Sequence, residues 1–320
     1  MIPATDGGMI DFAAGAPVAG SLDVAWIHGV PSKRHPPEPK IQLHHYDEHT
    51  VILRQSKSVS YEAPFLYLLF GNERALLLDT GATADPDLFP LRATVDQLIG
   101  EWLERHPRPG YELVVAHTHG HNDHVAGDAQ FAGRPATTVV SREQDAVRSF
   151  FGFDDRWPAQ TVTFDLGGRL LEVIGSPGHH RAAITCYDPW TGFLLTGDTV
   201  LPGRLYAFDY PAFLATLDRL VAVTERRNVK HVLGCHVEMT SQPGVDFPLG
   251  ARYQPDERAP QLTVAQLIAA RDAAVSVAGQ RGPHRFADFV IYNQPSLRDQ
   301  VKLSLGGLRH RISPRRQFRT

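Results

Sequence analysis

Short apolar runs alternate with amphipathic segments along most of this chain, and many of the runs end on polar residues. Strand-like runs occur at residues 51–56 (VILRQS) and on both sides of a turn at residues 71–73 within APFLYLLFGNERALLLDTG. Residues 90–105 carry apolar side chains at helical spacing, and a short strand, YELVVAH, follows. This order of elements predicts a layered α/β domain with polar groups at the strand ends.

The same alternation continues over the next hundred residues. Strands are expected in TTVVS, TVTFDLGGRLLEVIGSPGHH, FLLTGDTV and KHVLGCH, and helices in DHVAGDAQFA, SREQDAVRSFF and PAFLATLDRLVAVTERR. A further helix is predicted at residues 263–277 and a strand in FADFVIY.

The distribution of Gly, Pro and Arg suggests three regions. Residues 1–50 are predicted to form a partly irregular N-terminal arm because Gly and Pro are frequent in the first 40 residues. Residues 51–247 would be the catalytic core, and residues 248–320 a C-terminal extension packed on it. The extension ends in RHRISPRRQFRT, whose five arginines are expected to form a frayed surface tail.

Composition excludes several classes of protein. The 320 residues are 42% hydrophobic, which suffices for a packed core, and the formal net charge of -3 disfavours nucleic-acid or membrane partners. The two cysteines, Cys186 and Cys235, are interpreted as buried thiols. No signal peptide or run of roughly 20 apolar residues is apparent, so a cytoplasmic protein is expected.

The segment AHTHGHNDH, residues 116–124, holds four histidines and one aspartate at the end of a predicted strand. Zinc prefers imidazole nitrogen and carboxylate oxygen, and a catalytic zinc site keeps a position open for water. His117, His119 and His121 alternate, so any two of them could form a ligand pair. The adjacent Asp123 and His124 select the register.

Read as His119-x-His121-x-Asp123-His124, the loop resembles the H-x-H-x-D-H signature of the metallo-β-lactamase superfamily, and the resemblance extends from residue 65 to residue 236. It implies an αββα sandwich with two metal sites. His179 in SPGHH, Asp198 in LLTGDT and His236 in LGCH resemble the family's remaining ligands. The implied first site comprises His119, His121, His179 and Asp198, and the second comprises Asp123, His124, Asp198 and His236.

Other residues take supporting or structural interpretations. Asp79 in LLLDTG matches a family aspartate that orients the metal loop (residues 116–124) through hydrogen bonds without binding metal. His117 is either such a partner or a residue packed below the loop. The remaining strand-end histidines are interpreted as polar surface: His44, His45, His106, His180 and His231.

The resemblance implies a dinuclear zinc hydrolase of the glyoxalase II and lactonase-like branch. A hydroxide bridging two Zn²⁺ ions would attack an ester, lactone or thioester carbonyl of a small acyl substrate, with Asp198 bridging the metals and Asp123 relaying a proton. Iron or manganese would also suit these ligands. The alternatives are an iron redox enzyme similar to persulfide dioxygenases, incidental β-lactamase or phosphoesterase activity, and a non-catalytic binding module.

Two segments near the metal ligands supply candidate substrate-binding residues. Arg204 and Tyr206 follow Asp198, and Arg252 and Tyr253 follow His236. Packing is an equally good interpretation for the first pair, and adjacency alone suggests the second. The sequence leaves a homodimer contact open.

Overall fold

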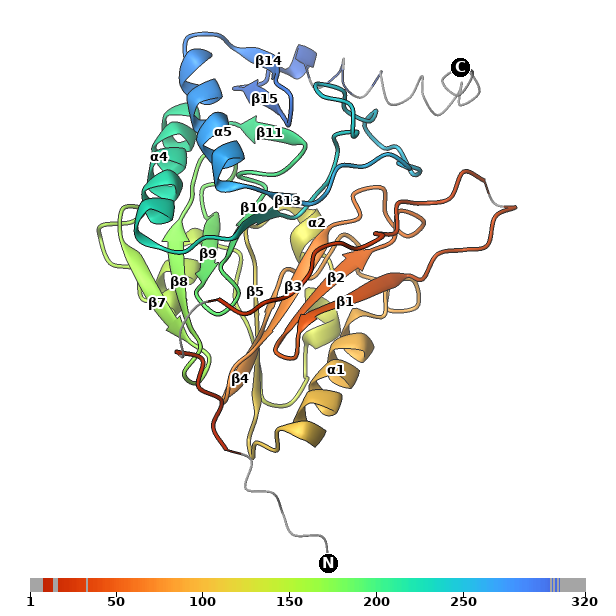
Figure 1. Ribbon diagram of the computed structural model, residues 1–320, viewed down its shortest axis with the longest axis vertical. Helices are drawn as coiled ribbons and strands as arrows, with labels where there is room; N and C mark the ends of the chain where they lie inside the picture. Colours follow the sequence, from red (N-terminus) through yellow and green to blue (C-terminus); the bar gives the residue numbers. More distant parts are fainter. Residues whose placement is uncertain are drawn as a thin grey trace, which may run out of the picture.

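Two six-stranded β-sheets face each other at the centre of the molecule, and helices cover both outer faces (Figure 1). The computed structural model describes residues 8–13, 17–32, 34–299, 301, 303 and 305, so the predicted Arg-rich tail lies outside the described residues. In spatial order, the first sheet contains β1 (Ile41–Asp47), β2 (Thr50–Gln55), β3 (Phe65–Phe70), β4 (Arg74–Leu78), β5 (Glu112–Ala116) and β6 (Thr137–Val139).

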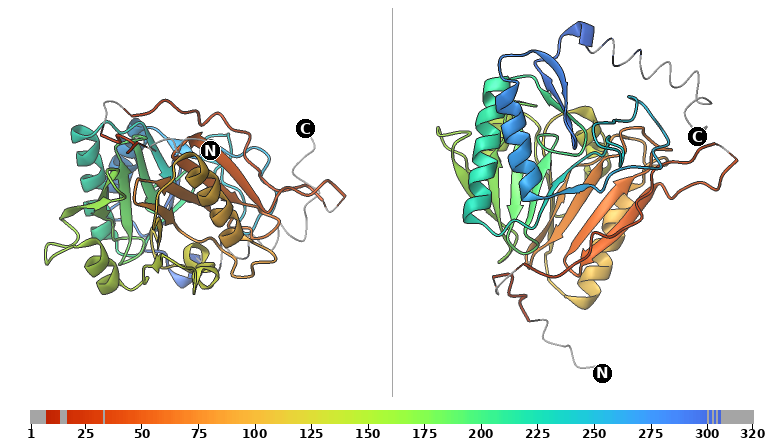
Figure 2. Two further views of the ribbon diagram at one scale, coloured as in Figure 1. Left: turned by 90° about the horizontal axis from the view of Figure 1, so that it is seen from below. Right: turned by 45° about the horizontal axis from the view of Figure 1, so that its top comes forward.

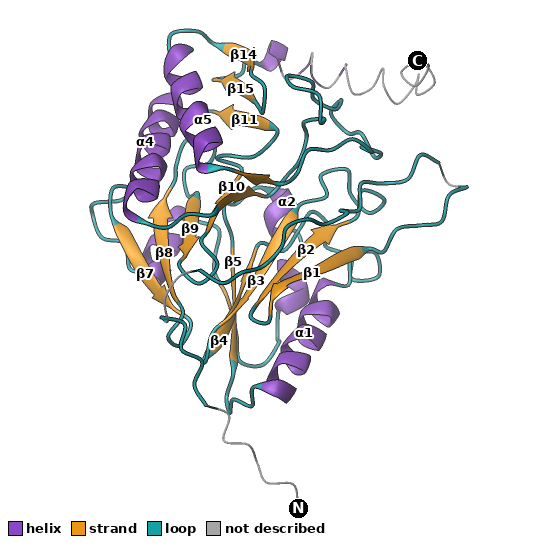
Figure 3. Cartoon of the chain, viewed as in Figure 1, coloured by secondary structure: helices purple, strands orange, loops and turns teal. Residues whose placement is uncertain are grey.

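The second sheet and the main helices complete four layers. In spatial order, this sheet contains β13 (Gln261–Leu262), β12 (His231–Gly234), β10 (Phe193–Gly197), β9 (Ile184–Asp188), β8 (Leu170–Gly175) and β7 (Thr161–Asp165). Helix α1 (Leu91–Arg105) lies outside the first sheet, whereas α4 (Tyr210–Arg226) and α5 (Val264–Ser276) lie together outside the second (Figures 2 and 3). The predicted αββα sandwich is therefore confirmed.

Strand β3 shows how the sequence builds two core layers at once. Because successive side chains of a strand point to opposite faces, Phe65, Tyr67 and Leu69 enter the core between the sheets. Their neighbours Leu66 and Leu68 enter the core shared with α1. A strand buried on both faces has no polar alternate positions, which explains the continuous apolar run FLYLLF.

Parallel pairing brings the polar strand ends to one edge of the sandwich. Strand β4 is parallel to β5, and β10 is parallel to β12, so the carboxyl ends within each pair lie side by side. The two sheets are joined at this edge by backbone hydrogen bonds of 2.8 Å from Ile184 N to Thr118 O and 2.7 Å from Phe65 N to Cys235 O. The loops that follow these strands therefore converge.

Several elements differ from the prediction. The segment predicted as one helix, DHVAGDAQFA, forms the short helix α2 (Asn122–Val125) and a 3-10 turn (Asp128–Phe131), separated at Gly127. Strands β1 and β9 were not predicted. The helix expected in SREQDAVRSFF is present as α3 (Gln144–Phe151).

A small third sheet lies beside the metal-loop edge; one of its strands overlaps the predicted segment FADFVIY, whereas the other two strands and their pairing into a sheet were not predicted. It contains β11 (Arg204–Ala207), β15 (Val290–Asn293) and β14 (Gly282–Arg285), in the spatial order β11, β15, β14. Strand β11 follows Asp198 in the predicted core, and it pairs in parallel with β15 of the predicted extension. The boundaries proposed at residues 50 and 247 remain predictions.

A buried ionic cluster fastens the loop between β12 and β13 to the first sheet. Glu257 lies 2.7 Å from Arg54 Nη1 and 3.6 Å from Lys57 Nζ, and all three side chains are largely withdrawn from solvent. The Arg54 guanidinium also lies over the Phe65 ring, 4.7 Å from its centroid.

Across the described residues, no helix is long and apolar enough to cross a membrane.

Candidate metal centre

The seven predicted ligand residues lie together at the strand-end edge, on loops that follow strands of both sheets. In the first group, formed by His119, His121 and His179, the nearest candidate ligand atoms lie within 4.8 Å of one another. The same limit holds within a second group that adjoins the first. The second group contains Asp123, His124, Asp198 and His236.

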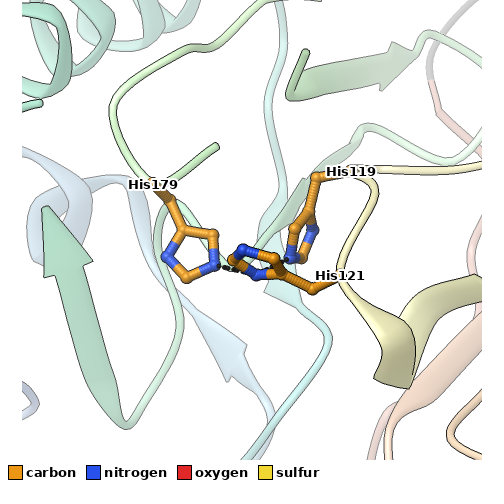
Figure 4. A group of neighbouring side chains, drawn as sticks. All are labelled: His119, His121 and His179. Atoms are coloured by element: carbon orange, nitrogen blue, oxygen red, sulfur yellow. Dashed lines mark hydrogen bonds between the residues drawn. The ribbon is translucent and has the colours of Figure 1, made fainter. Parts of the chain in front are cut away.

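The first group presents three converging imidazole nitrogens (Figure 4). His121 Nδ1 lies 2.9 Å from His119 Nε2 and 3.0 Å from His179 Nε2. His179 Nδ1–H donates to the Tyr206 carbonyl at 2.9 Å, which leaves the Nε2 lone pair facing the group. Burial lowers the pKa of His179 to about 4 and that of His119 well below its usual value. Neutral imidazoles of this kind are good metal ligands.

The second group combines two imidazoles with two carboxylates. His236 Nε2 lies 3.2 Å from Asp123 Oδ2, and His236 Nδ1–H donates to the Glu62 carbonyl at 3.0 Å. Burial lowers the pKa of His236, but the charges of Asp198 and Asp123 outweigh it and raise this pKa to about 9. The clustered carboxylates therefore attract positive charge, as protons or as a metal ion.

Asp198 lies between the two groups. Its Oδ2 is 4.0 Å from His119 Nε2 and 3.6 Å from His124 Nε2, while its Oδ1 is 3.6 Å from His236 Nε2. Asp198 Oδ1 is buried, yet it has no hydrogen-bond partner within the described part of the chain. An unpartnered buried carboxylate oxygen is costly unless a cation lies beside it. The donor types and this oxygen fit a pair of metal ions.

Asp79 supports the metal loop through hydrogen bonds to its carboxylate. Its carboxylate is fully buried and accepts hydrogen bonds from Thr118 N at 2.7 Å, Thr118 Oγ1 at 2.8 Å and His124 Nδ1 at 2.9 Å. The Cys235 thiol donates to the same carboxylate at 3.2 Å. Asp79 thus fixes which nitrogen of His124 faces the centre.

His117 has a separate structural contact. Its Nε2 lies 2.8 Å from Asp128 Oδ1, and the same oxygen accepts a 2.7 Å hydrogen bond from Thr80 Oγ1. His117 thus links the metal loop to the 3-10 turn that carries Asp128.

Cys186 and Cys235 are both buried free thiols, as predicted.

A cavity of about 310 Å³ opens onto five of the candidate ligands. Arg204 and Tyr206, predicted near the substrate, are among its lining residues. Arg252 and Tyr253 are not, which corrects the prediction made from adjacency. Arg252 instead donates to the carbonyls of Lys57 and Ser58, while Tyr253 forms an isolated bridge with Gly29.

Several residues that line the cavity were not predicted from the sequence, because the segments that carry them are not recognisable as parts of one site. Glu238, two residues after His236, could have been suspected from adjacency alone. The others depend on tertiary structure. The missed lining residues are Glu62, Leu201, Phe208, Glu238, Leu249 and Leu303.

His180, interpreted as polar surface, lies nearer the centre than expected. It is partly buried, and its ring centroid is 5.1 Å from that of His121. Burial lowers the pKa of His180 to about 4. His180 is nevertheless not a member of either candidate ligand group.

Glu48, His49 and His106 form another group of metal-ligating types, away from the cavity. Trp102 Nε1–H donates to His49 Nδ1 at 3.1 Å, so the proton of the neutral imidazole is on Nε2. Neither nitrogen of His49 then has a free lone pair for a metal.

The two-sheet sandwich, with histidine- and aspartate-bearing loops at one edge, defines a metal-dependent hydrolase. The family model described as the Metallo-beta-lactamase superfamily matches residues 62–230, and the chain belongs to this superfamily. The family and its hydrolase class were predicted from the sequence and are confirmed. Membership implies a metal cofactor, which the donor set fits.

Curated relatives point to one branch of the superfamily. A hydroxyacylglutathione hydrolase from Synechococcus sp. (strain JA-3-3Ab) is 30% identical over 73% of this chain and 86% of its own length. Another from Synechococcus sp. (strain JA-2-3B'a(2-13)) is 34% identical over 64% of this chain and 81% of its own. A metallo-beta-lactamase from Pontibacter korlensis aligns with a TM-score of 0.48 at 17% identity, over 73% of this chain and 99% of its own.

Proposed function

We propose that this chain is a two-zinc hydrolase that cleaves an ester, lactone or thioester carbonyl of a small acyl substrate. The position of Asp198 is the observation that carries the proposal. One of its carboxylate oxygens faces imidazoles of both groups, and the other faces His236. A carboxylate placed in this way is suited to bridge two metal ions.

Two zinc ions held there would lower the pKa of a shared water to about 7 and polarise the substrate carbonyl. Asp123 lines the cavity, and His124 and His236 hold the pKa of its carboxyl well below its usual range against the effect of burial. The carboxylate is therefore ionised, as a metal ligand must be, and the proton relay to the leaving group that the sequence suggested for Asp123 remains a proposal. Tyr206, also in the lining, stays a neutral phenol because burial raises its pKa.

The names of the relatives support hydrolysis of a thioester over the other carbonyl substrates, since those proteins are named hydroxyacylglutathione hydrolases. The same names support hydrolysis over iron-dependent redox chemistry, for which the nitrogen and oxygen donors would also be suitable. We retain zinc as the proposed metal.

Replacing Asp198 tests the proposal. Asp198→Asn keeps the shape of the side chain but weakens metal binding, so bound zinc should fall from two ions per chain to one or fewer. Hydrolysis of a simple aryl ester should fall about a thousandfold. Zinc is measured by elemental analysis of the purified protein.

The matched control is His45→Gln, at an exposed histidine of β1. It should retain both zinc content and turnover. An Asp198→Asn protein with two zinc ions and full activity would remove the bridging role and, with it, the proposed mechanism.

A further inference from the structure

Apart from the candidate ligands, the cavity wall is mainly apolar. Leu201, Phe208, Leu249 and Leu303 line it beside Tyr206. The Tyr206 and Phe208 rings are nearly parallel, at an interplanar angle of 10° with centroids 6.1 Å apart. Contact with such a wall removes apolar substrate surface from water, and this burial favours binding.

Among the described residues that line the cavity, Arg204 is the only basic residue other than the histidines. Its positive charge is compensated by neighbouring carboxylates. Its Nη1 lies 2.5 Å from Glu238 Oε1, and its Nη2 lies 2.8 Å from Asp246 Oδ2. Nη2 also donates to the Phe247 carbonyl. The remaining nitrogen, Nε, is buried, and no hydrogen-bond partner for it lies among the described residues. Arg204 is therefore a buried cation whose charge is already compensated by Glu238 and Asp246.

The acidic lining residues offer nothing to an anion. Glu238 directs Oε1 to the Arg204 side chain, and its Oε2 accepts from Arg204 N at 2.6 Å. Glu62 adds a second carboxyl group beside His236 and Asp123. Away from the proposed zinc ions, a substrate carboxylate drawn into this cavity would lose water without gaining a cationic side chain as partner among the described lining residues.

A second cavity continues the apolar wall away from the candidate ligands. Its volume is about 460 Å³, and it shares Arg204, Leu249 and Leu303 with the first. Phe247, Pro248, Pro283 and Tyr292 extend its lining. Its other arginine, Arg285, is also paired with Asp246. The second cavity thus combines apolar surface with paired charges.

We propose that this site takes acyl substrates whose groups beyond the scissile bond are uncharged and apolar, and that it disfavours glutathione thioesters. This inference rests on the proposed hydrolase function and narrows its substrate. Glutathione has two free carboxylates beyond the scissile bond, and no described side chain of the cavity lining offers either of them an uncompensated positive charge. The chain would then differ in substrate class from the relatives named hydroxyacylglutathione hydrolase.

Two thioesters that share one acyl group test the inference. The zinc-loaded full chain is given S-butanoylglutathione and the S-butanoyl thioester of N-acetylcysteamine, an uncharged thiol. In both, water adds its oxygen to the carbonyl carbon, the C–S bond breaks, and a carboxylate, a thiol and one proton result. We expect kcat/KM to be about tenfold or more higher for the uncharged thioester, with the difference carried mainly by KM.

A charge introduced into the wall gives a matched second test. Leu249→Lys adds a cation where the two cavities meet, and Leu249→Met controls for the change of shape. The lysine variant should lower KM for the glutathione thioester several-fold relative to the methionine variant. It should not lower KM for the uncharged thioester.

The outcomes separate this inference from the function on which it rests. A zinc-loaded protein that cleaves neither thioester nor an aryl ester contradicts the hydrolase proposal itself. A wild-type protein that cleaves the glutathione thioester as well as or better than the uncharged one overturns the substrate inference while the hydrolase function stands.

Discussion

At the scale of single residues, Asp79 combines an unusual backbone conformation with a demanding set of contacts. Its φ of 71° lies in the left-handed region, which Asp and Asn tolerate better than most residues. That conformation occurs directly after β4, where the carboxylate meets Thr118, His124 and Cys235. Backbone and side chain thus impose separate requirements at one position.

Asp79→Asn separates these requirements, because Asn keeps the left-handed backbone but replaces one acceptor oxygen with a donor. We expect zinc affinity to fall about 10- to 100-fold, since the orientation and basicity of His124 depend on this carboxylate. Competition with a chromophoric chelator measures the loss. Cys235→Ala, which removes only the weak thiol donor, should change affinity much less; equal losses in the two variants would contradict the orienting role.

At the scale of elements, the sequence predicted those with strong periodicity and missed those defined by pairing. Helices α1 and α5 lie within a residue of their predicted limits, and Thr263 begins α5 with the capping box that its sequence favours. Strand β11, RLYA, is too short to carry a period and is defined by its pairing with β15.

The residues of the candidate site also divide into those that the sequence predicts and those that it does not. Residues in a dense local motif, such as His119 and Asp123, could be proposed from the sequence, and the structure brings them together. Glu62 and Leu249 could not be proposed, because their neighbours along the chain give no sign that they meet in one cavity. Their placement depends on how distant strands and loops pack.

The cluster of Arg54, Lys57 and Glu257 makes an element-level prediction about pH. Burial lowers the pKa of the Lys57 ammonium from 10.5 to about 8, with Glu257 opposing this effect. Unfolding restores the usual pKa, so between these values the unfolded chain binds more protons than the folded one, and stability rises with pH.

Comparison with Lys57→Met isolates this contribution from the other groups that titrate. Relative to the variant, the wild-type free energy of unfolding should increase by about 2 kcal/mol between roughly pH 8 and pH 10. Urea unfolding curves at several pH values measure the difference. Parallel pH profiles for the two proteins would show that Lys57 is not held at a lowered pKa.

At the scale of the whole molecule, the metal centre joins the two sheets. The three-histidine group draws on the loops after β5 and β8, and the second group adds residues after β10 and β12. Metal binding should therefore stabilise the sandwich as a unit, because the unfolded chain cannot present these ligands together.

Chelation should lower the melting temperature of the zinc-loaded protein, and added zinc should restore it. Zinc at about a hundred times its Kd corresponds to about 2.7 kcal/mol of stabilisation, which differential scanning fluorimetry resolves easily. Asp198→Asn is the control, since its melting temperature should respond much less to the chelator. A wild-type melting temperature that is indifferent to chelation would contradict the joining role.

The spread of these ligands along the chain also sets the order of events during synthesis. His119 leaves the ribosome more than a hundred residues before His236, and β12, which precedes His236, pairs with β10, which is made before it, and with β13, which is made after it. A nascent chain that stops before β12 thus lacks part of the second group. Complete metal capture therefore requires synthesis to pass His236, and zinc uptake by stalled chains of increasing length would time the closure of the sandwich.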